Sequence, residues 1–223
     1  MSTELGPFAS EHRASISSGS LFAQPSGWVG VWQQTLPELG AGRLLLRELR
    51  PEDAPALLRA MTRSDVSRFI SPPPTTLAGF EQFIDWTKAE RTAGTSLCYG
   101  VVDQGSGFVI GLFQVRLLEA TFRVAEWGFA LAQEFWGSGV FMESASRLLE
   151  FVFGDLGVQR LEARAVVANT RGNGALRKLG AVPKSVLRQS FCRNGEHFDQ
   201  LLWTLPALDC RRTREPMGAP PLH

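Results

Sequence analysis

The chain has 223 residues with a formal net charge of +1, and its composition is 44% hydrophobic and 20% charged. These values are typical of a soluble globular protein with one domain or two small ones, and the length allows a sizeable core. The near-neutral charge favours neither nucleic acid nor an acidic membrane surface as a partner, and no apolar run reaches the ~20 residues of a membrane span.

The two ends of the chain differ in composition from its middle. Residues 1–27 are rich in Ser, Gly, Ala and Pro without a lasting period, so we expect a flexible leader. The segment 28–42 carries aromatic and leucine residues, and we expect it to dock on the domain by local packing rather than to act as a dimer contact or a lid. The domain is expected over 43–205, and the Arg- and Pro-rich segment 206–223 is expected to be a disordered tail.

Hydrophobic periodicity and turn residues divide the middle of the chain into helices and strands. In chain order they are a strand at 43–49, a helix from 53, a helix at 76–92, strands at 96–102, 108–118 and 123–131, a helix at 137–153, a strand at 160–167, a helix at 170–179, and a hairpin of strands 182–191 and 197–204. Asn194-Gly195 is a strong two-residue turn signal for that hairpin.

The lengths of the links predict the topology. Short links between the second and fourth strands indicate an antiparallel meander, whereas the helix between the fourth and fifth strands indicates a parallel pair. The predicted fold class is therefore mixed α/β. We expect a single domain with a central, mostly antiparallel sheet of about six or seven strands, flanked by about four helices.

The cysteines give no sign of a structural site. The chain has an odd number of cysteines, which are widely spaced and are not part of a Cys/His cluster. They are Cys98, Cys192 and Cys210. The sequence therefore supports neither a disulfide framework nor a zinc site, and no metal is expected. The N-terminus lacks a basic segment followed by an apolar one, so we expect a cytoplasmic protein.

The segment from Glu126 to Glu143 predicts a strand, a Gly-Ser-Gly turn at 137–139 and an amphipathic helix. A helix start leaves about four N–H groups unpaired and carries partial positive charge, and glycine lets a phosphate approach this backbone closely. A plain strand-to-helix turn would need the same residues, so the pattern alone leaves both interpretations open. The Rossmann fingerprint is excluded because residue 142 is Met, and a Walker loop is absent.

This segment resembles the acetyl-CoA signature Q/R-x-x-G-x-G/A of the GNAT superfamily. It most resembles the ribosomal-protein N-terminal acetyltransferases of the RimJ/RimL type, since Glu126-Trp-Gly-Phe, Trp136-Gly-Ser-Gly and Glu143 match that branch without a gap. A second segment, at 169–180, resembles the family's motif N-x-x-S-x-x-x-L-x-K-L-G-F. It reads Asn169-Thr-Arg-Gly-Asn-Gly-Ala-Leu-Arg-Lys-Leu-Gly. The resemblance covers roughly residues 43–205. Glu134 departs from it, because Gln or Arg is usual at this position.

The resemblance implies that acetyl-CoA is the cosubstrate and that the acceptor is a primary amine, on a protein N-terminus or a small molecule. It places the pyrophosphate on backbone N–H groups of Trp136, Gly137, Ser138, Gly139 and Val140. It places the pantetheine on the main chain of Phe129, Ala130 and Leu131 and on the side chain of Asn169. An N-cap would also explain Asn169, and the two uses are compatible. Homodimers are common in the family, so a homodimer is one expectation.

Glu126 is the candidate general base, because an amine must lose a proton before it attacks and a carboxylate can accept it directly or through water. Burial in an apolar strand would make this carboxylate a stronger base. The alternatives are a carboxylate on the solvent face of the strand, or one paired with Arg123 or Arg164.

The usual general acid of the family is missing. Its Ser position is Gly172, and the chain's one tyrosine, Tyr99, lies on an earlier strand. Solvent or a hydroxyl such as Ser138 or Ser144 would then protonate the leaving thiolate. The missing acid also leaves a second hypothesis open, a non-catalytic acyl-CoA-binding or interaction module on the same fold.

Overall fold

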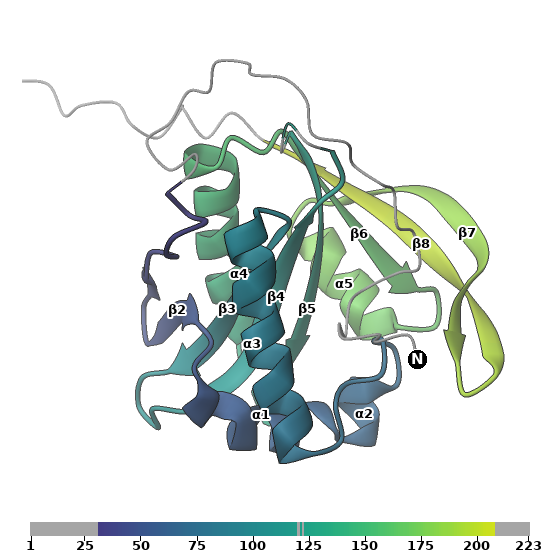
Figure 1. Ribbon diagram of the computed structural model, residues 1–223. Helices are drawn as coiled ribbons and strands as arrows, with labels where there is room; N and C mark the ends of the chain where they lie inside the picture. The colour runs from purple at the N-terminus through teal and green to yellow at the C-terminus, as the bar shows by residue number, and fades with distance from the viewer. Residues whose placement is uncertain (1–30, 120, 122, 208–223) are drawn as a thin grey trace, which may run out of the picture.

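Eight strands form one sheet whose neighbours are antiparallel, except for the parallel pair of β5 and β6 (Figure 1). The structure is a computed structural model that describes residues 31–119, 121 and 123–207. In spatial order the strands are β1 (Leu39–Ala41), β2 (Leu44–Glu48), β3 (Ser96–Asp103), β4 (Val109–Leu117), β5 (Val124–Leu131), β6 (Arg160–Val166), β8 (Glu196–Pro206) and β7 (Val182–Arg193).

The helices are α1 (Ala54–Met61), α2 (Ser64–Ser67), α3 (Leu77–Ala93), α4 (Val140–Glu150) and α5 (Thr170–Lys178). The side chain of Thr76 caps α3 by accepting the N–H of Gly79, and α3 ends at Gly94 in the left-handed conformation. In Figure 1, α3 crosses in front of the sheet and the β7–β8 hairpin extends beyond its right-hand edge. That hairpin turns at Asn194 and Gly195, which both have positive φ, as the sequence predicts.

The fold class is confirmed as mixed α/β, and so is the parallel pairing of the strands on either side of α4. The sheet has eight strands rather than six or seven, because Leu39–Ala41 folds back on β2 through a turn at Gly42. Three residues are too few to show the alternation that marks a strand. The short helix α2 is also additional. The predicted leader 1–27 and residues 208–223 of the predicted tail lie outside the described residues.

Two apolar clusters lie on opposite faces of the sheet, because successive side chains of a strand point to opposite sides. On one face α4 and α5 cover Phe113 and Trp127, and this cluster includes residues that precede β2: Trp32, Leu36 and Leu39. On the other face α1 and α3 cover Cys98 and Leu112. Among the described residues, β6, β7 and β8 contribute nothing to this second cluster. Polar and apolar side chains are mixed on that part of the face, which carries Arg160, Glu162 and Leu202.

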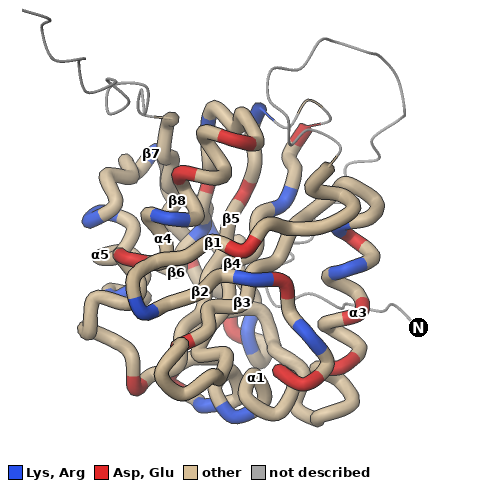
Figure 2. Tube along the Cα trace, turned by 90° about the vertical axis from the view of Figure 1, so that its left-hand side faces the viewer, with Lys and Arg blue, Asp and Glu red and all other residues tan. Residues whose placement is uncertain are grey.

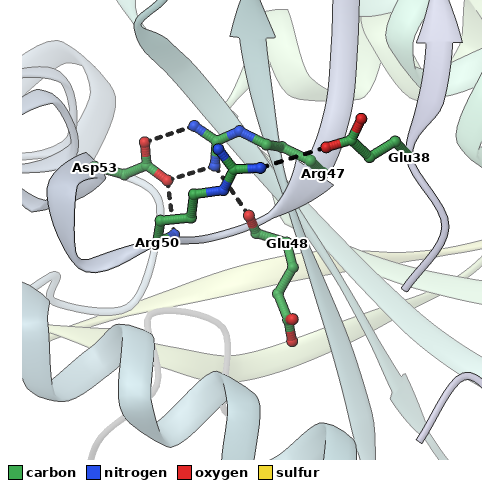
Figure 3. A network of polar contacts seen from close by, with 5 residues as sticks. All are labelled: Glu38, Arg47, Glu48, Arg50 and Asp53. Atoms are coloured by element: carbon green, nitrogen blue, oxygen red, sulfur yellow. Dashed lines mark hydrogen bonds and ion pairs between the residues drawn. The ribbon is translucent and has the colours of Figure 1, made fainter. Parts of the chain in front are cut away.

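A buried ion pair joins β2 to the start of α1 (Figure 3). Arg47 donates from Nη1 and Nη2 to the two carboxylate oxygens of Asp53 at 2.7 and 2.8 Å, and the two side chains are 10% and 7% exposed. The hydrogen bond to Asp53 raises the pKa of the Arg47 guanidinium further above its ordinary value. Asp53 also accepts the N–H of Arg50 at 2.8 Å, so its carboxylate closes the turn before α1 and does not cap α1 itself.

Asp53→Ala is expected to lower the free energy of unfolding by about 3 kcal/mol, because it leaves the Arg47 guanidinium buried without its anion. Equilibrium denaturation by urea measures this loss. The double variant Arg47→Met/Asp53→Leu removes both charges and is expected to recover most of the stability. A loss below about 1 kcal/mol in the single variant, the range of an exposed pair, would contradict the structural role assigned to this contact.

Candidate active site

A gap opens between β5 and β6 where the two strands part. Their parallel pairing joins Val124–Glu126 to Arg160–Glu162, whereas β5 continues to Leu131 and β6 to Val166. Strands that stay paired are about 4.8 Å apart and exchange evenly spaced hydrogen bonds. From Trp127 onward, β5 therefore presents an edge toward β6 that is not paired to it. Such an edge suits an extended ligand that adds to the sheet like a strand.

A glycine turn between β5 and α4 forms the mouth of this gap. Gly137 and Gly139 have φ angles of 76° and 88°, in the left-handed region that favours glycine. A β-carbon built on either residue would meet no atom of the described chain within 4 Å. At Gly139 no described side chain caps α4, so the first N–H groups of the helix are available to an anion. The turn thus has the open space and the donors that a pyrophosphate requires.

Trp136 holds the turn by contacts that the sequence did not predict. Its backbone N–H donates to the carbonyl oxygen of Gln133 at 3.0 Å, and its indole N–H donates to the carbonyl oxygen of Leu131 at 2.9 Å. The guanidinium of Arg171, in α5, lies 4.6 Å from its ring centroid, which joins the two sides of the mouth. Both residues were predicted to bind the cofactor through the main chain. The backbone N–H of Trp136 and the carbonyl oxygen of Leu131 already form hydrogen bonds within the protein.

The other predicted cofactor-binding residues lie along the same path. Phe129 packs on Phe141 of α4 with ring centroids 4.5 Å apart, whereas Ala130 belongs to the cluster on the opposite face. The exposed Ser138 donates its hydroxyl to the preceding turn, and Val140 is fully buried beneath the start of α4. Contacts from most of these residues to a ligand would therefore be made by the backbone.

Asn169 forms the N-cap of α5, which is the alternative that the sequence left open. Its side-chain oxygen accepts the N–H of Gly172 at 2.9 Å. A β-carbon at Gly172 would lie 2.6 Å from the side-chain nitrogen of Asn169, so glycine allows the two to approach closely. Asn173 ties α5 to the end of β6, because it donates to the carbonyl oxygen of Val166 and accepts from the indole of Trp203.

Glu126 lies at the point where β5 and β6 part, and it is 8% exposed. Arg164 donates to its Oε1 at 2.8 Å, and Arg116 donates to its Oε2 at 2.5 Å. Pairing with Arg164 is one of the alternatives that the sequence left open, whereas Arg123 donates to Gln159 instead. For a base we expected a carboxylate buried among apolar side chains. The Glu126 carboxylate lies instead between two guanidinium groups.

The two serines proposed as general acids and the chain's one tyrosine differ in accessibility. Tyr99 is 0% exposed, its hydroxyl donates to the carbonyl oxygen of Pro37, and burial raises its pKa well above the ordinary value. Ser144 is also fully buried, and it donates to the carbonyl oxygen of Val140. Tyr99 and Ser144 are therefore structural, and of the three only Ser138 is exposed at the mouth of the gap.

An ion pair lies beside the turn at the position where the sequence departs from the family signature. The Nη1 atom of Arg63, which precedes α2, is 3.5 Å from Oε1 of Glu134, and the two side chains are 49% and 60% exposed. Arg63 also donates to the side-chain oxygen of Gln133 at 2.6 Å. The negative charge of Glu134 near the proposed pyrophosphate site is therefore balanced only through an exposed contact, which water screens.

Glu134→Gln is expected to tighten CoA binding about two- to fivefold at low salt, because it removes a repulsive charge and frees Arg63 from its carboxylate partner. Calorimetric titration with CoA at low and high ionic strength measures the effect, which should shrink in high salt. Glu81→Gln, at an exposed position of α3, is the matched control. Weaker binding, or an unchanged affinity at low salt, would show that Glu134 has no repulsive role.

Comparison with known proteins decides the family. Residues 43–182, more than half of the chain, match the model of the acetyltransferase (GNAT) domain. This chain belongs to the GNAT acetyltransferase family. Acetyltransferases of this family use acetyl-CoA and an amine acceptor, so the predicted enzyme class is confirmed and the catalytic interpretation is favoured over a non-catalytic module.

Relatives and solved structures match the chain over most of its length. The uncharacterized N-acetyltransferase YoaA of Bacillus subtilis (strain 168) is 26% identical over 172 residues, which are 76% of this chain and 96% of YoaA. RimJ of Mycobacterium smegmatis in complex with CoA-disulfide is 20% identical and has a TM-score of 0.69, covering 82% of this chain and 91% of RimJ. The ribosomal-protein-S5-alanine acetyltransferase of Vibrio fischeri is 18% identical and also has a TM-score of 0.69, covering 78% and 98%. The two structures establish the likeness in fold.

Charge and potential metal ligands are dispersed over the described part of the chain. Within it, no group of three or more His, Cys, Asp or Glu side chains is placed to hold a metal ion. Its helices are all too short or too polar to cross a membrane. In the view of Figure 2, both acidic and basic positions occur along α3.

Proposed function

We propose that this GNAT protein transfers the acetyl group of acetyl-CoA to a primary amine by direct attack within a ternary complex. One observation carries the proposal: the unpaired edge of β5 beyond Glu126 is followed, after residues 132–136, by an uncapped glycine turn at Gly137 and Gly139. An extended pantetheine chain followed by a pyrophosphate would use these two features in this order.

The residues proposed to hold the cosubstrate act mainly through the backbone. The turn and the first helical residue would donate N–H groups to the pyrophosphate, and the edge of β5 and the start of α5 would bind the pantetheine. These residues are Gly137, Ser138, Gly139 and Val140 for the first part, and Phe129, Ala130 and Asn169 for the second. When bound, acetyl-CoA supplies an acetyl group that is activated as a thioester.

Glu126 is proposed to act on the acceptor amine. The amine has a pKa near ~8 on a protein N-terminus or ~10 on an alkyl chain, so it is largely protonated at pH 7. A carboxylate has about four acceptor sites, and Arg116 and Arg164 occupy two of them. The others would accept the proton of the amine, or would hold a water that carries it away. The two guanidinium groups fix the position of the carboxylate while it does so.

The departing thiolate requires little help from the chain. It is a fair leaving group without a general acid, and Gly172 carries no hydroxyl with which to protonate it. The exposed hydroxyl of Ser138 or solvent would supply the proton. Loss of the usual acid is therefore compatible with turnover.

The acceptor is proposed to be a protein N-terminus or a small amine. The fold shared with RimJ and with a ribosomal-protein-S5-alanine acetyltransferase supports testing protein N-termini first. Peptides with a free N-terminus, the same peptides with a blocked N-terminus, and short alkylamines separate the two classes.

Steady-state kinetics test direct attack. Initial rates at varied acetyl-CoA and amine are expected to give intersecting double-reciprocal lines, and acetyl-CoA alone should leave the protein unmodified in mass spectrometry. Cys98 is not suited to an acetyl-enzyme, because it is 3% exposed and burial raises the pKa of its thiol. Parallel lines together with an acetylated protein would contradict the ternary complex.

A further inference from the structure

A buried amide on β4 lacks a hydrogen-bond partner. Gln114 is 5% exposed, and its side-chain oxygen Oε1 is one of two buried side-chain polar atoms in the described chain without a partner. The other is a guanidinium nitrogen of Arg193 in the β7–β8 hairpin. Burying an acceptor without a donor is costly, and native proteins tolerate it mainly where a water, an ion or a ligand completes the bond.

Gln114 shares a face of the sheet with Glu126. It is paired in register with Gly128 of β5, and Arg116, two residues further along β4, is paired with Glu126. Because side chains two apart on a strand point to the same side, Gln114 and Arg116 lie on one face, and so do Gly128 and Glu126. Gly128 has no side chain to separate Gln114 from the gap that opens beyond Glu126.

On the other side, the register neighbour of Gln114 is Cys98 of β3. Cys98 is a free and buried cysteine, and a thiol is only a weak hydrogen-bond donor. The two register neighbours of Gln114, Gly128 and Cys98, therefore offer its amide oxygen no good donor from their side chains. No described group donates to this oxygen, and a molecule bound on this face would supply the missing donor.

We propose that Gln114 binds the acceptor amine, through a hydrogen bond from an N–H of the amine to its side-chain oxygen. This inference rests on the proposed function. Gln114 and Glu126 are diagonal neighbours on adjacent strands. The β-carbons of such residues are roughly 7 Å apart, so one small group can contact both of these long side chains. A primary amine has enough N–H groups to donate to Glu126 and Gln114 at once, and this second contact would orient its lone pair for attack.

The position of Gln114 favours the amine over the cosubstrate as its partner. The pantetheine would lie along the edge of β5 that faces β6, whereas Gln114 is on β4, on the opposite side of β5. A bound acceptor would instead lie over the face of the sheet that carries Glu126. Gln114 would thus act in recognition of the acceptor and leave the affinity for acetyl-CoA unchanged.

Gln114→Met tests the inference, because Met has a similar length and no polar group. With the amine or N-terminal peptide that gives the highest wild-type rate, kcat/KM for the acceptor is expected to fall roughly tenfold. KM for acetyl-CoA should stay at the wild-type value. The thermal midpoint of the ligand-free protein is expected to rise by about 2–4 °C, because an unsatisfied buried group is removed. A merely structural role would not give this combination of higher stability and weaker acceptor use.

Gln200→Met is the matched control for stability. Gln200 is 8% exposed, and its side-chain oxygen accepts a hydrogen bond from Ser190 at 3.0 Å. Because that amide is already satisfied, its replacement is expected to lower the thermal midpoint.

The remaining outcomes overturn the inference, and they separate it from the proposed function. If the wild type releases thiol with an acceptor and Gln114→Met has the same kcat/KM for that acceptor, the amide is satisfied by water and the inference fails alone. If KM for acetyl-CoA rises instead, Gln114 binds the cosubstrate, and the inference also fails. If the wild type releases no thiol with any amine or peptide, the proposed function fails and the inference fails with it.

Discussion

Replacing Gly137 with Glu is expected to abolish measurable binding of CoA, a loss of roughly 100-fold or more. Gly137 has a φ of 76°, so a side chain there adds backbone strain of about 1–3 kcal/mol. The open space above its α-carbon would be filled by the new side chain, and its carboxylate would repel the pyrophosphate directly over the start of α4. Calorimetric titration with CoA measures the loss.

Gly107→Glu controls for strain in this experiment. Gly107, in the link between β3 and β4, has a φ of 75°, and a β-carbon there also meets no described atom within 4 Å. Both variants should therefore lose a similar amount of thermal stability, whereas only Gly137→Glu should lose CoA. Unchanged CoA affinity in Gly137→Glu would refute the pyrophosphate site. An equal loss of affinity in both variants would assign the effect to strain.

Glu126→Gln is expected to slow acetylation by about 10²–10⁴-fold near pH 6, the usual contribution of a general base. The loss should shrink as the pH rises toward the pKa of the acceptor amine, because the amine then loses its proton to solvent. Profiles of kcat/KM against pH for the variant and the wild type measure this difference. The two profiles should converge at high pH.

The two arginines beside Glu126 give a second, structural explanation for a loss of acetylation rate in Glu126→Gln. Glu126→Gln removes the negative charge that Arg116 and Arg164 both contact, and a displaced strand would slow the reaction equally at every pH. Glu162→Gln is the matched control, because Glu162 is paired in register with Glu126 and is itself bonded to Arg160. That variant should keep near wild-type rates. A loss in Glu126→Gln that does not change with pH would contradict the role of a base.

The local features of the fold were predictable because their signals lie within single segments. The Asn194-Gly195 turn and the helix after the Gly-Ser-Gly turn each depend on a few adjacent residues. The parallel pair β5–β6 also follows from one helical connection. The three-residue strand β1 was missed, because its length gives no period.

The surroundings of Glu126 could not be predicted, because they depend on register between strands. Arg116 reaches Glu126 only because β4 and β5 pair them directly, and Arg164 reaches it diagonally from β6. The link between β4 and β5 does not fix that register from sequence alone, and a shift by one residue would turn Arg116 to the other face. The same limit hid Gln114, which the sequence shows only as a polar residue inside an apolar strand.

Acceptor-dependent release of thiol from acetyl-CoA tests whether this protein is an N-acetyltransferase. The wild-type protein would be incubated with acetyl-CoA and a panel of N-terminal peptides and primary amines, with CoA binding measured in parallel. We expect CoA binding together with thiol release that depends on at least one acceptor having a free amine. CoA binding without release on any acceptor would contradict the proposed catalysis, and the absence of both would also overturn the assignment of the glycine turn.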